Sequence, residues 1–337
     1  MDHEVRSNHI LKSGRVLDMN NGNITDVSGI KVGNIENMDA LTGCTAILAE
    51  EGAICGVDVR GSAPGTRETD LLNPINAVDT VHAISLTGGS AYGLEAASGI
   101  MNYLEEKGIG LDVDVTRVPI IPSAVLFDLQ VGDSSIRPDK KMGYQAAKQA
   151  TKGSFPFGNV GAGCGATVGK LAGFDNCMKG GLGSASIHLD NGLTVGAIVA
   201  VNALGDIRNP NNRHIIAGPI DPNRKTILDS LTLLEKVDAD MRFGTNTTIG
   251  AVAMNAALSK AEATKVAQVT QNALARTIYP THTMADGDTI FALATGGKSH
   301  SLDLIANMAA HVMEEAILQA VQSAESVANI PSYKSMT

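Results

Sequence analysis

The segment Gly244-Thr245-Asn246-Thr247-Thr248-Ile249-Gly250 holds the residues of this chain with the clearest chemical potential. In it, a threonine stands at the head of an apolar run, directly after Gly and Asn. A chain cut before Thr247 would expose this residue as an N-terminal nucleophile. Its hydroxyl would attack, and its new α-amine, with an ordinary pKa of about 7.7–8.0, could serve as the base. On the pattern alone, Thr247 is more simply the β-branched first residue of a strand.

Two carboxylates stand close together in Asp286-Gly287-Asp288, just before another apolar run. A solvated turn is the ordinary interpretation of such a sequence. Beside a nucleophile, however, a pair of carboxylates would orient the amine and the hydroxyl and favour the ionised state. The pair is therefore a candidate partner of Thr247.

Lys170 and Asn202 each end an apolar stretch. Lys170 follows a glycine-rich run, and its default interpretation is a side chain that reaches solvent. A partly desolvated lysine beside a hydroxyl would instead assist by electrostatics or proton transfer. Asn202 closes the run Val199-Ala200-Val201 and either caps the next turn or points its NH₂ at an oxyanion. In enzymes that use such a donor, its loss costs about 2.7–4 kcal/mol of barrier stabilisation.

Gly88-Gly89-Ser90 lies between an apolar run and a helix-like segment. Such a turn can direct backbone N–H groups at an anion or an oxyanion. The motif matches neither a nucleotide-binding loop nor the elbow of a serine hydrolase, and close strand–helix packing is its more usual explanation. The histidines show no metal-binding spacing, so we expect no metal site.

Composition excludes several classes of protein. With 337 residues, 44% of them hydrophobic and 18% charged, the chain is neither disordered nor membrane-spanning in bulk. The net charge of −9 argues against non-specific binding to nucleic acid. No run approaches eighteen apolar residues, so we expect no transmembrane helix.

The cysteines and the N-terminus suggest where the protein works. Cys44, Cys55, Cys164 and Cys177 form no CxxC pair and no Cys/His metal spacing. We expect them to be buried free thiols in a reducing compartment. The segment 1–6 lacks the apolar core of a signal peptide. Together these features favour a cytoplasmic protein.

The pattern along the chain predicts one α+β domain. Residues 1–22 are polar and poorly periodic, and we expect a flexible arm. Short apolar runs between Gly- and Asp-containing turns predict strands over 30–33, 43–48, 53–59, 83–87, 119–121, 124–129, 161–166, 180–187, 193–202, 249–254 and 289–294. Helices are predicted over 91–107, 141–151, 226–238, 259–278 and 301–323, and a surface loop over 206–225. Strand clusters separated by helices favour α+β layers over a βαβ repeat.

Several segments together resemble one family, the DmpA-type aminopeptidases and their nylon-oligomer hydrolase relatives. The likeness extends from about residue 23 to residue 322. Its motifs include Leu86-Thr87-Gly88-Gly89-Ser90, Val201-Asn202-Ala203-Leu204-Gly205-Asp206, Asn246-Thr247-Thr248-Ile249-Gly250 and Met284-Ala285-Asp286-Gly287-Asp288-Thr289. Each piece is modest, but their combination is specific.

The resemblance implies a fold and a maturation step. The fold is a four-layer αββα sandwich formed by a single domain over 23–337, assembled as a homo-oligomer, a tetramer of αβ units. Such proteins are made as one inactive chain that cleaves itself before a Ser or Thr. Here the match places the cut between Asn246 and Thr247, giving an α chain of residues 1–246 and a β chain of residues 247–337.

The resemblance also assigns roles to residues. Thr247 matches the nucleophile, Lys170 and Asn202 match positions that assist catalysis and hold the oxyanion, and Asp286 and Asp288 match the carboxylates around the nucleophile. No cofactor is implied.

A looser match concerns substrate binding. Phe127 falls near the position where nylon hydrolases place an active-site Tyr, which would leave one hydroxyl donor missing here. With Gly88, Gly89 and Ser90, it forms the tentative substrate-binding set.

Three functions follow as alternatives. The first is a self-processed amidohydrolase that acts on small peptides or on amide oligomers such as those of aminohexanoate. The second is acyl transfer of the ornithine acetyltransferase type, in which an amine captures the acyl-enzyme faster than water does. The third is an uncleaved binding or scaffold protein. The substrate itself stays open, because pocket loops select it by only about 1–3 kcal/mol.

Overall fold

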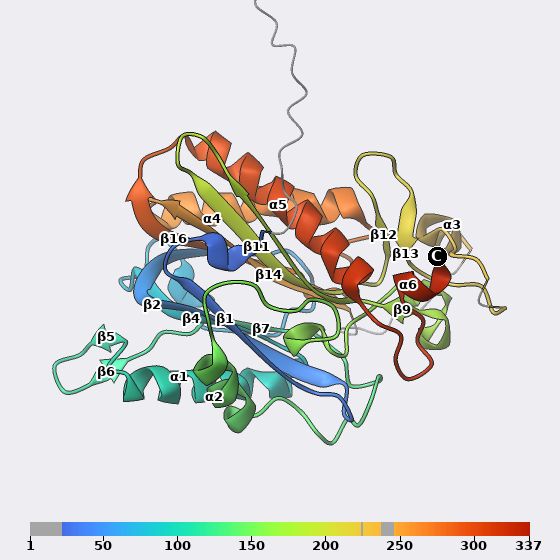
Figure 1. The fold of residues 1–337 in the computed structure, drawn as a ribbon, viewed down its shortest axis with the longest axis horizontal. Coiled ribbons are helices and arrows are strands. Elements are labelled where there is room, and N and C mark those ends of the chain that lie inside the picture. The colour runs from blue at the N-terminus through green and yellow to red at the C-terminus, as the bar shows by residue number, and fades with distance from the viewer. Residues whose placement is uncertain (1–21, 224, 237–245) are drawn as a thin grey trace, which may run out of the picture.

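The computed structural model describes residues 22–223, 225–236 and 246–337 (Figure 1). The predicted arm over 1–22, apart from Gly22, lies outside the described residues, and so do the two residues before Asn246. The main structural feature is a stack of helix layers and sheet layers. Two helices cover it at the top of Figure 1, and two others close it at the bottom.

One hydrogen-bonded path joins the strands of the stack. Its order is β10 (Gly181–His188), β11 (Thr194–Asn202), β14 (Thr247–Ala256), β16 (Thr289–Lys298), β2 (Thr42–Val59), β4 (Thr80–Thr87), β7 (Ser123–Val125) and β3 (Thr66–Arg67), with β1 (Ile30–Asn37) paired to β2 off this path. All neighbours are antiparallel except the β14–β16 and β4–β7 pairs. The outer layers are α4 (Lys260–Thr277) with α5 (Leu302–Ser323), and α1 (Ala96–Glu106) with α2 (Lys140–Gln149).

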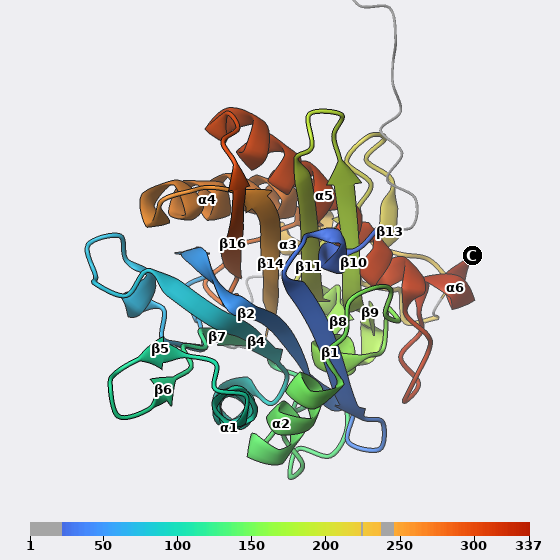
Figure 2. The same ribbon diagram turned by 60° about the vertical axis from the view of Figure 1, so that its left-hand side comes forward.

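Strand β2 belongs to both sheet layers. Its first half pairs with β1 and β4, and its second half pairs with β16. The register with β4 shifts between Leu48 and Ala53, at the point where one half gives way to the other. Figure 2 shows the result: β10, β11, β14 and β16 run together, while β1, β2 and β4 cross them at an angle. The runs 43–48 and 53–59, predicted as two strands, are therefore one long strand.

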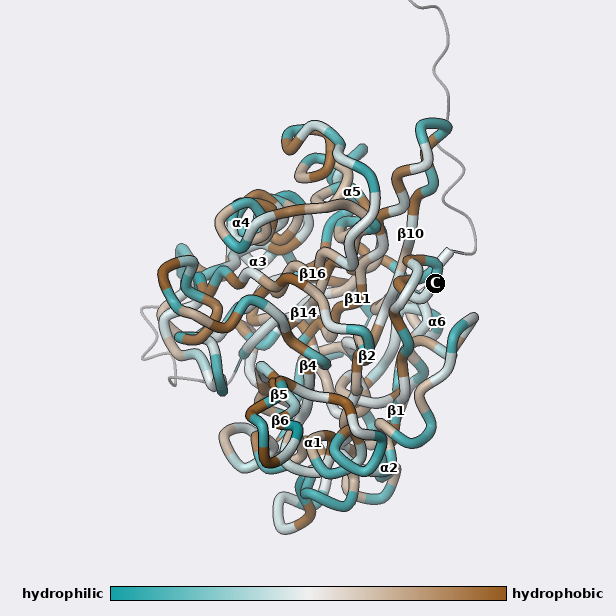
Figure 3. Tube along the Cα trace, turned by 90° about the vertical axis from the view of Figure 1, so that its left-hand side faces the viewer, coloured by the Kyte–Doolittle hydropathy of each residue, from teal (hydrophilic) through white to brown (hydrophobic). Residues whose placement is uncertain are grey.

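Three hydrophobic cores fill the spaces between four layers. Along β14, Val252 and Met254 pack in the core beneath α4 and α5, whereas Ala251 and Ala253 pack in the core between the sheets. This alternation follows from the two-residue period of a strand. The third core joins β2 and β4 to α1 and α2. Burial on both faces explains the long apolar runs in the central strands, which appear as brown stretches inside the molecule in Figure 3. The predicted four-layer αββα sandwich is confirmed.

Local signals fix the helix that precedes β16. Ser259 is the N-cap of α4: its side chain accepts a hydrogen bond from the Glu262 N–H, and the Glu262 carboxylate accepts one from the Ser259 N–H. This capping box satisfies two backbone donors at the start of the helix. The helix begins where the sequence predicted it, and it carries the chain from β14 to the parallel strand β16.

The prediction of a strand over 161–166 is wrong. A 3-10 helix, η4 (Gly161–Gly163), is followed by β8 (Thr167–Val168), which pairs with β9 (Met178–Lys179). Gly161 has a φ of 50°, in the left-handed region, and its N–H donates to Glu36 Oε2 at 2.9 Å. A glycine run permits such a turn, and the apolar pattern does not reveal it.

Smaller elements surround the sandwich. The predicted loop over 206–225 contains two short strands, and the helix predicted over 226–238 is observed only as α3, with 237–238 outside the described residues. Residues 119–121 form no strand. The remaining elements are β5 (Leu111–Asp112), β6 (Arg117–Val118), β12 (Asp206–Arg208), β13 (Ile215–Ala217), α3 (Ser230–Leu234), β15 (Ile278–Tyr279) and α6 (Tyr333–Met336). All four cysteines are buried and free, as predicted.

Candidate functional site

Three strand ends meet at one edge of the sheet. Thr247 is the first residue of β14, and it pairs in register with Asn202, the last residue of the antiparallel strand β11. Strand β16 runs parallel to β14, so its beginning lies at the same edge, and the Asp286-Gly287-Asp288 turn immediately precedes it. The topology thus brings together residues that are far apart in the sequence.

The peptide bond between Asn246 and Thr247 is buried and held from two sides. The Thr247 hydroxyl donates a hydrogen bond to the carbonyl oxygen of Asn246. The same oxygen accepts a hydrogen bond from the Gly287 N–H at 3.1 Å. Gly287 has no space for a side chain, because a Cβ there would lie 2.9 Å from Thr247 Oγ1. A hydroxyl and an N–H donor therefore both reach this carbonyl group.

Asp288 accepts hydrogen bonds on both of its carboxylate oxygens. Oδ1 accepts one from the Thr248 N–H at 2.7 Å. Oδ2 accepts one from Thr281 Oγ1 at 3.1 Å and lies 2.9 Å from His282 Nδ1. The side chain is buried, so this set of donors replaces the water that an ionised carboxylate needs. Asp288 thereby ties the start of β14 to the loop before β16.

Asp286 lies in a different electrostatic setting. Its Oδ2 accepts hydrogen bonds from the Thr283 N–H and Thr283 Oγ1, both at 2.7 Å. Burial raises the pKa of this carboxyl above its ordinary value, and the neighbouring Asp288 charge raises it further. A carboxyl of raised pKa is suited to accepting and returning a proton.

Lys170 and Asn202 are in direct contact. Lys170 Nζ donates to Asn202 Oδ1 at 3.0 Å and to the Asn202 carbonyl oxygen at 3.1 Å. Burial lowers the pKa of Lys170 to about 7, so a large part of this amine is neutral at neutral pH. Asn202 Oδ1 also accepts from the Thr167 N–H, which fixes the direction of the amide NH₂. That NH₂ donates one hydrogen to the Phe127 carbonyl oxygen at 3.0 Å, and its second hydrogen has no partner among the described residues.

Of the tentative substrate-binding residues, Phe127 contributes its backbone to the site through this carbonyl. The amides of the Gly88-Gly89-Ser90 turn are used within the protein. They donate to Gly43 O at 2.9 Å, Asp128 Oδ1 at 2.7 Å and Leu126 O at 2.9 Å, respectively. In this conformation all three amides have partners within the protein, so none is left for a bound anion or oxyanion, and close packing accounts for the turn.

Three further titratable residues lie near these groups and were assigned no role from the sequence. Asp128 is buried, which raises its pKa to about 6, and it holds the Gly89 N–H together with the Thr42 hydroxyl. Lys179 is fully buried and donates to the carbonyl oxygens of Cys164 and Ala166. The third is His282. Only Lys179 had a signal in the sequence, since a single charge within a glycine-rich apolar stretch is unusual.

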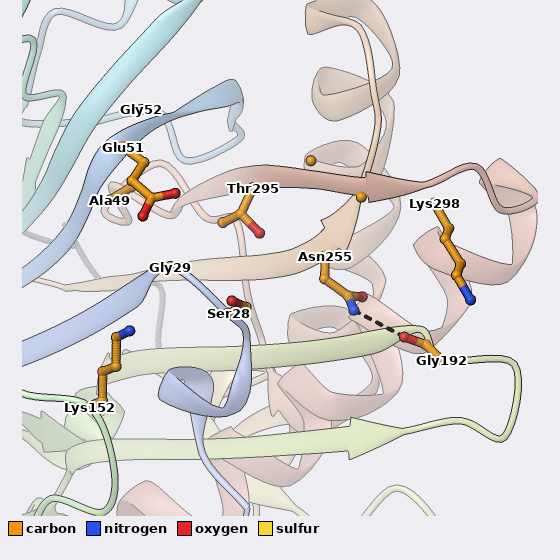
Figure 4. A pocket seen from close by; sticks show the side chains of 12 residues that line it. Ser28, Gly29, Ala49, Glu51, Gly52, Lys152, Gly192, Asn255, Thr295 and Lys298 are labelled. Carbon is orange, nitrogen blue, oxygen red and sulfur yellow. Dashed lines mark hydrogen bonds between the residues drawn. The ribbon is translucent and has the colours of Figure 1, made fainter.

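A separate hollow lies at the opposite end of the strands (Figure 4). It has a volume of about 390 Å³, and its lining includes Glu51, Lys152, Asn255 and Lys298. Asn255 is near the end of β14, whereas Thr247 begins it, so roughly 26 Å of strand separates the hollow from the site. The hollow is not part of the candidate site.

Two further searches covered only the described part of the chain. No group of three His, Cys, Asp or Glu side chains there is arranged to hold a metal ion. Nor does any helix in those residues have the length and apolar character needed to cross a membrane.

Known proteins are similar in sequence to this chain over nearly its full length. The model of peptidase family S58 matches residues 22–333. An uncharacterized aminopeptidase of Mycobacterium leprae is 43% identical over an alignment of 350 residues, gaps included. This alignment covers 93% of this chain and 93% of that protein. The 6-aminohexanoate-oligomer endohydrolase of a Kocuria strain is 30% identical over 314 residues, covering 88% of this chain and 85% of the enzyme.

Solved structures share the fold. A β-aminopeptidase from Burkholderia has a TM-score of 0.64 at 23% identity, covering 92% of this chain and 89% of its own. The L-aminopeptidase D-Ala-esterase/amidase of Ochrobactrum anthropi, described as a new variant among the Ntn hydrolase fold, has a TM-score of 0.67 at 17% identity, covering 90% and 87%. The family expected from the motifs is confirmed: the chain belongs to peptidase family S58 and is a hydrolase of peptide or amide bonds.

Proposed function

We propose that this chain is a self-processing amidohydrolase that uses Thr247 as an N-terminal nucleophile on small peptides or amide oligomers. The observation that carries the proposal is the geometry at Asn246. Its carbonyl oxygen accepts hydrogen bonds from both the Thr247 hydroxyl and the Gly287 N–H. The names of the relatives, aminopeptidase and 6-aminohexanoate-oligomer endohydrolase, support the substrate class.

The first step is cleavage of the chain itself. Thr247 Oγ attacks the carbonyl carbon of Asn246, and the Gly287 N–H stabilises the oxyanion that forms. Lys170, partly neutral at neutral pH, takes the hydroxyl proton, and the leaving amide nitrogen is protonated as its bond to carbon breaks. The product is an ester between the Asn246 carbonyl and Thr247 Oγ. Water hydrolyses it, leaving the carboxylate of Asn246 and the free α-amine of Thr247.

The mature reaction repeats this chemistry on a substrate. Thr247 Oγ attacks the substrate carbonyl, and the α-amine or Lys170 accepts the proton and returns it to the leaving amine. The remaining amide hydrogen of Asn202 and the Gly287 N–H hold the oxyanion. Asp286 and Asp288 orient the α-amine. Water then releases the acyl group, so each step uses groups of the chain and water alone.

Intact-mass spectrometry and a denaturing gel test the self-processing. The wild-type chain should give two species that end at Asn246 and begin at Thr247, whereas Thr247→Ala should give one species of 34.9 kDa. Thr247→Ser, which keeps a hydroxyl, is the matched control and should still be cut. A single wild-type species of 34.9 kDa with unchanged activity in Thr247→Ala would reject the proposal and favour an uncleaved protein.

Substrate class and reaction type need a second experiment. p-Nitroanilides of amino acids, β-peptides and aminohexanoate oligomers should be compared at equal enzyme concentration. Added amines test for acyl transfer, because a transferase would form the amine adduct in place of the free acid. Hydrolysis predicts free acid as the product whatever amine is present.

Assembly and location complete the proposal. We propose a tetramer of αβ units, which mass photometry would test. The four buried free thiols support a reducing compartment, consistent with the cytoplasm. Fractionation of cells would check this location directly.

A further inference from the structure

His282 makes an unexplained contact beside the site. Its Nδ1 lies 2.9 Å from Asp288 Oδ2, and its backbone N–H donates to the same oxygen at 3.1 Å. Its backbone is in the left-handed region, with a φ of 56°, which is uncommon for a residue other than glycine. Such a conformation persists only where surrounding contacts favour it.

The ring has one polar contact among the described residues. Because a carboxylate only accepts hydrogen bonds, Nδ1 must carry the proton that it shares with Asp288. The other ring nitrogen, Nε2, is buried and finds no hydrogen-bond partner in the described part of the chain. The polar function of this side chain is therefore concentrated in Nδ1.

The contact leads directly to the nucleophile. His282 Nδ1 binds one oxygen of Asp288, and the other oxygen accepts the Thr248 N–H at 2.7 Å. In the uncut chain, Thr247 is held by residues on both sides. After cleavage it is a chain end, and the first amide behind it that a side chain holds is that of Thr248. The orientation of Asp288 then decides where the hydroxyl and the α-amine of Thr247 lie.

We propose that His282 is a positioning residue, which through Nδ1 fixes Asp288 and through Asp288 fixes the mature Thr247. This inference rests on the proposed function of Thr247. A misplacement of about 1 Å in a reacting group can cost about 100-fold in rate. Loss of the contact should therefore lower kcat more than it changes KM.

Three substitutions of His282 test which of its two ring nitrogens has the positioning role. His282→Asn places an amide NH₂ where Nδ1 stands and tolerates the positive φ, so it should keep kcat within about threefold of wild type. His282→Gln extends its amide toward the position of Nε2, and His282→Ala removes both nitrogens. Both of these should lower kcat by roughly 10- to 100-fold, with a smaller change in KM.

The control is His300, whose Nε2 is also buried and without a described partner. It follows the end of β16, whereas Asp288 precedes its start. His300→Ala should leave kcat unchanged. Melting temperatures and the extent of cleavage are measured for every variant. If His282→Ala does not fold, the Asn and Gln variants still decide the question.

Two results would overturn the inference. One is a folded, cleaved His282→Ala enzyme with wild-type kcat. The other is rescue by Gln but not by Asn, which would assign the role to Nε2. In either case, the proposed function still holds if the cleavage and activity of the wild-type chain require Thr247. If the wild-type chain is neither cut nor dependent on Thr247, both proposals fail together.

Discussion

At the scale of single residues, burial gives the site its reactivity. Lys170 and Asp286 are each shifted toward the neutral form, the lysine downward in pKa and the carboxyl upward. Both shifts have the same leading cause, the loss of water around a charge. Two groups that would be fully charged in water can thus exchange protons near neutral pH.

The first prediction concerns pH. We propose that the neutral form of Lys170 is the base, and its pKa is about 7, so self-cleavage should accelerate about tenfold per pH unit below 7 and level off above it. Before the cut no α-amine exists at Thr247, so the profile reports Lys170 without that second amine. The measurement is the cleavage rate of freshly translated chain from pH 5 to 9. A rate independent of pH would exclude Lys170 as the base.

Folding stability should respond to the same group. The folded pKa of Lys170 lies below its unfolded value, so the unfolded chain binds more protons between about pH 7 and pH 10.5. The contribution of Lys170 to the free energy of unfolding should therefore increase with pH through this window. Urea unfolding of Thr247→Ala and of Thr247→Ala/Lys170→Met at pH 7 and pH 9 tests it. The rise should be smaller in the double variant, and an equal rise would contradict the prediction.

Asn202 offers a test of the oxyanion donor. Asn202→Asp keeps an oxygen for the Thr167 N–H and for Lys170 but lacks the NH₂ group. Its kcat should fall about 100- to 1000-fold, as expected for one lost donor. Asn202→Ala should lose stability as well as rate, since it leaves buried groups without a partner. If Asn202→Asp kept kcat within threefold, the donor role would be rejected.

At the scale of elements, the turn before β16 is as important as the strand ends. The Gly287 N–H reaches the Asn246 carbonyl only because the backbone of the turn packs directly against Thr247. A Cβ on Gly287 would also lie 2.8 Å from the Ala63 carbonyl oxygen, so the turn has no space on either side. The glycine is a requirement of the site as well as of the turn.

Gly287→Ala should therefore remain uncut or be cut far more slowly. Gly296→Ala is the comparison: it lies in β16, its Cβ would meet nothing within 4 Å, and its φ of 86° costs only local strain. That variant should lose some stability but cleave normally. Cleavage is followed on a denaturing gel over time. Normal processing of Gly287→Ala would show that the N–H contact is dispensable.

At the scale of the whole molecule, the proposed cut lies at the start of β14, a central strand of the sheet. Strand β14 lies between β11 and β16, and β16 lies between β14 and β2. Both strands are buried on two faces by separate cores. The two chains produced by the cut should therefore stay together as one folded unit.

Size-exclusion chromatography tests this prediction. Wild type and Thr247→Ala should elute at the same volume, and each should unfold in a single thermal transition. Fragments should separate only in denaturant. Separation under native conditions would mean that the sheet does not hold the β chain.

The sequence reveals some of this architecture and hides the rest for a physical reason. β11, β14 and β16 were predictable because burial on both faces leaves long apolar runs. The continuity of β2 was not, because Glu50, Glu51 and Gly52 resemble a turn although they lie within the strand. Local sequence patterns reflect the period of the backbone. They do not show which distant residues become neighbours in the folded chain.

The candidate site, too, could be predicted from the sequence only in part. The motifs located Thr247, Asn202 and the carboxylates, which the sheet then brings to one edge. They assigned no role to His282 or Asp128, whose contacts depend on partners that only the folded chain supplies. A single histidine in a loop has no periodicity by which to recognise it.

The hydrogen bond from Gly287 to Asn246 has a consequence for the timing of synthesis. Gly287 is translated well after Asn246, and it reaches that carbonyl only when β16 lies beside β14. The growing chain on the ribosome cannot assemble this arrangement before its last third has emerged and folded. The proposed cleavage would therefore act as a checkpoint. A cut chain would be one that has already reached its native state, and a misfolded copy would stay uncut.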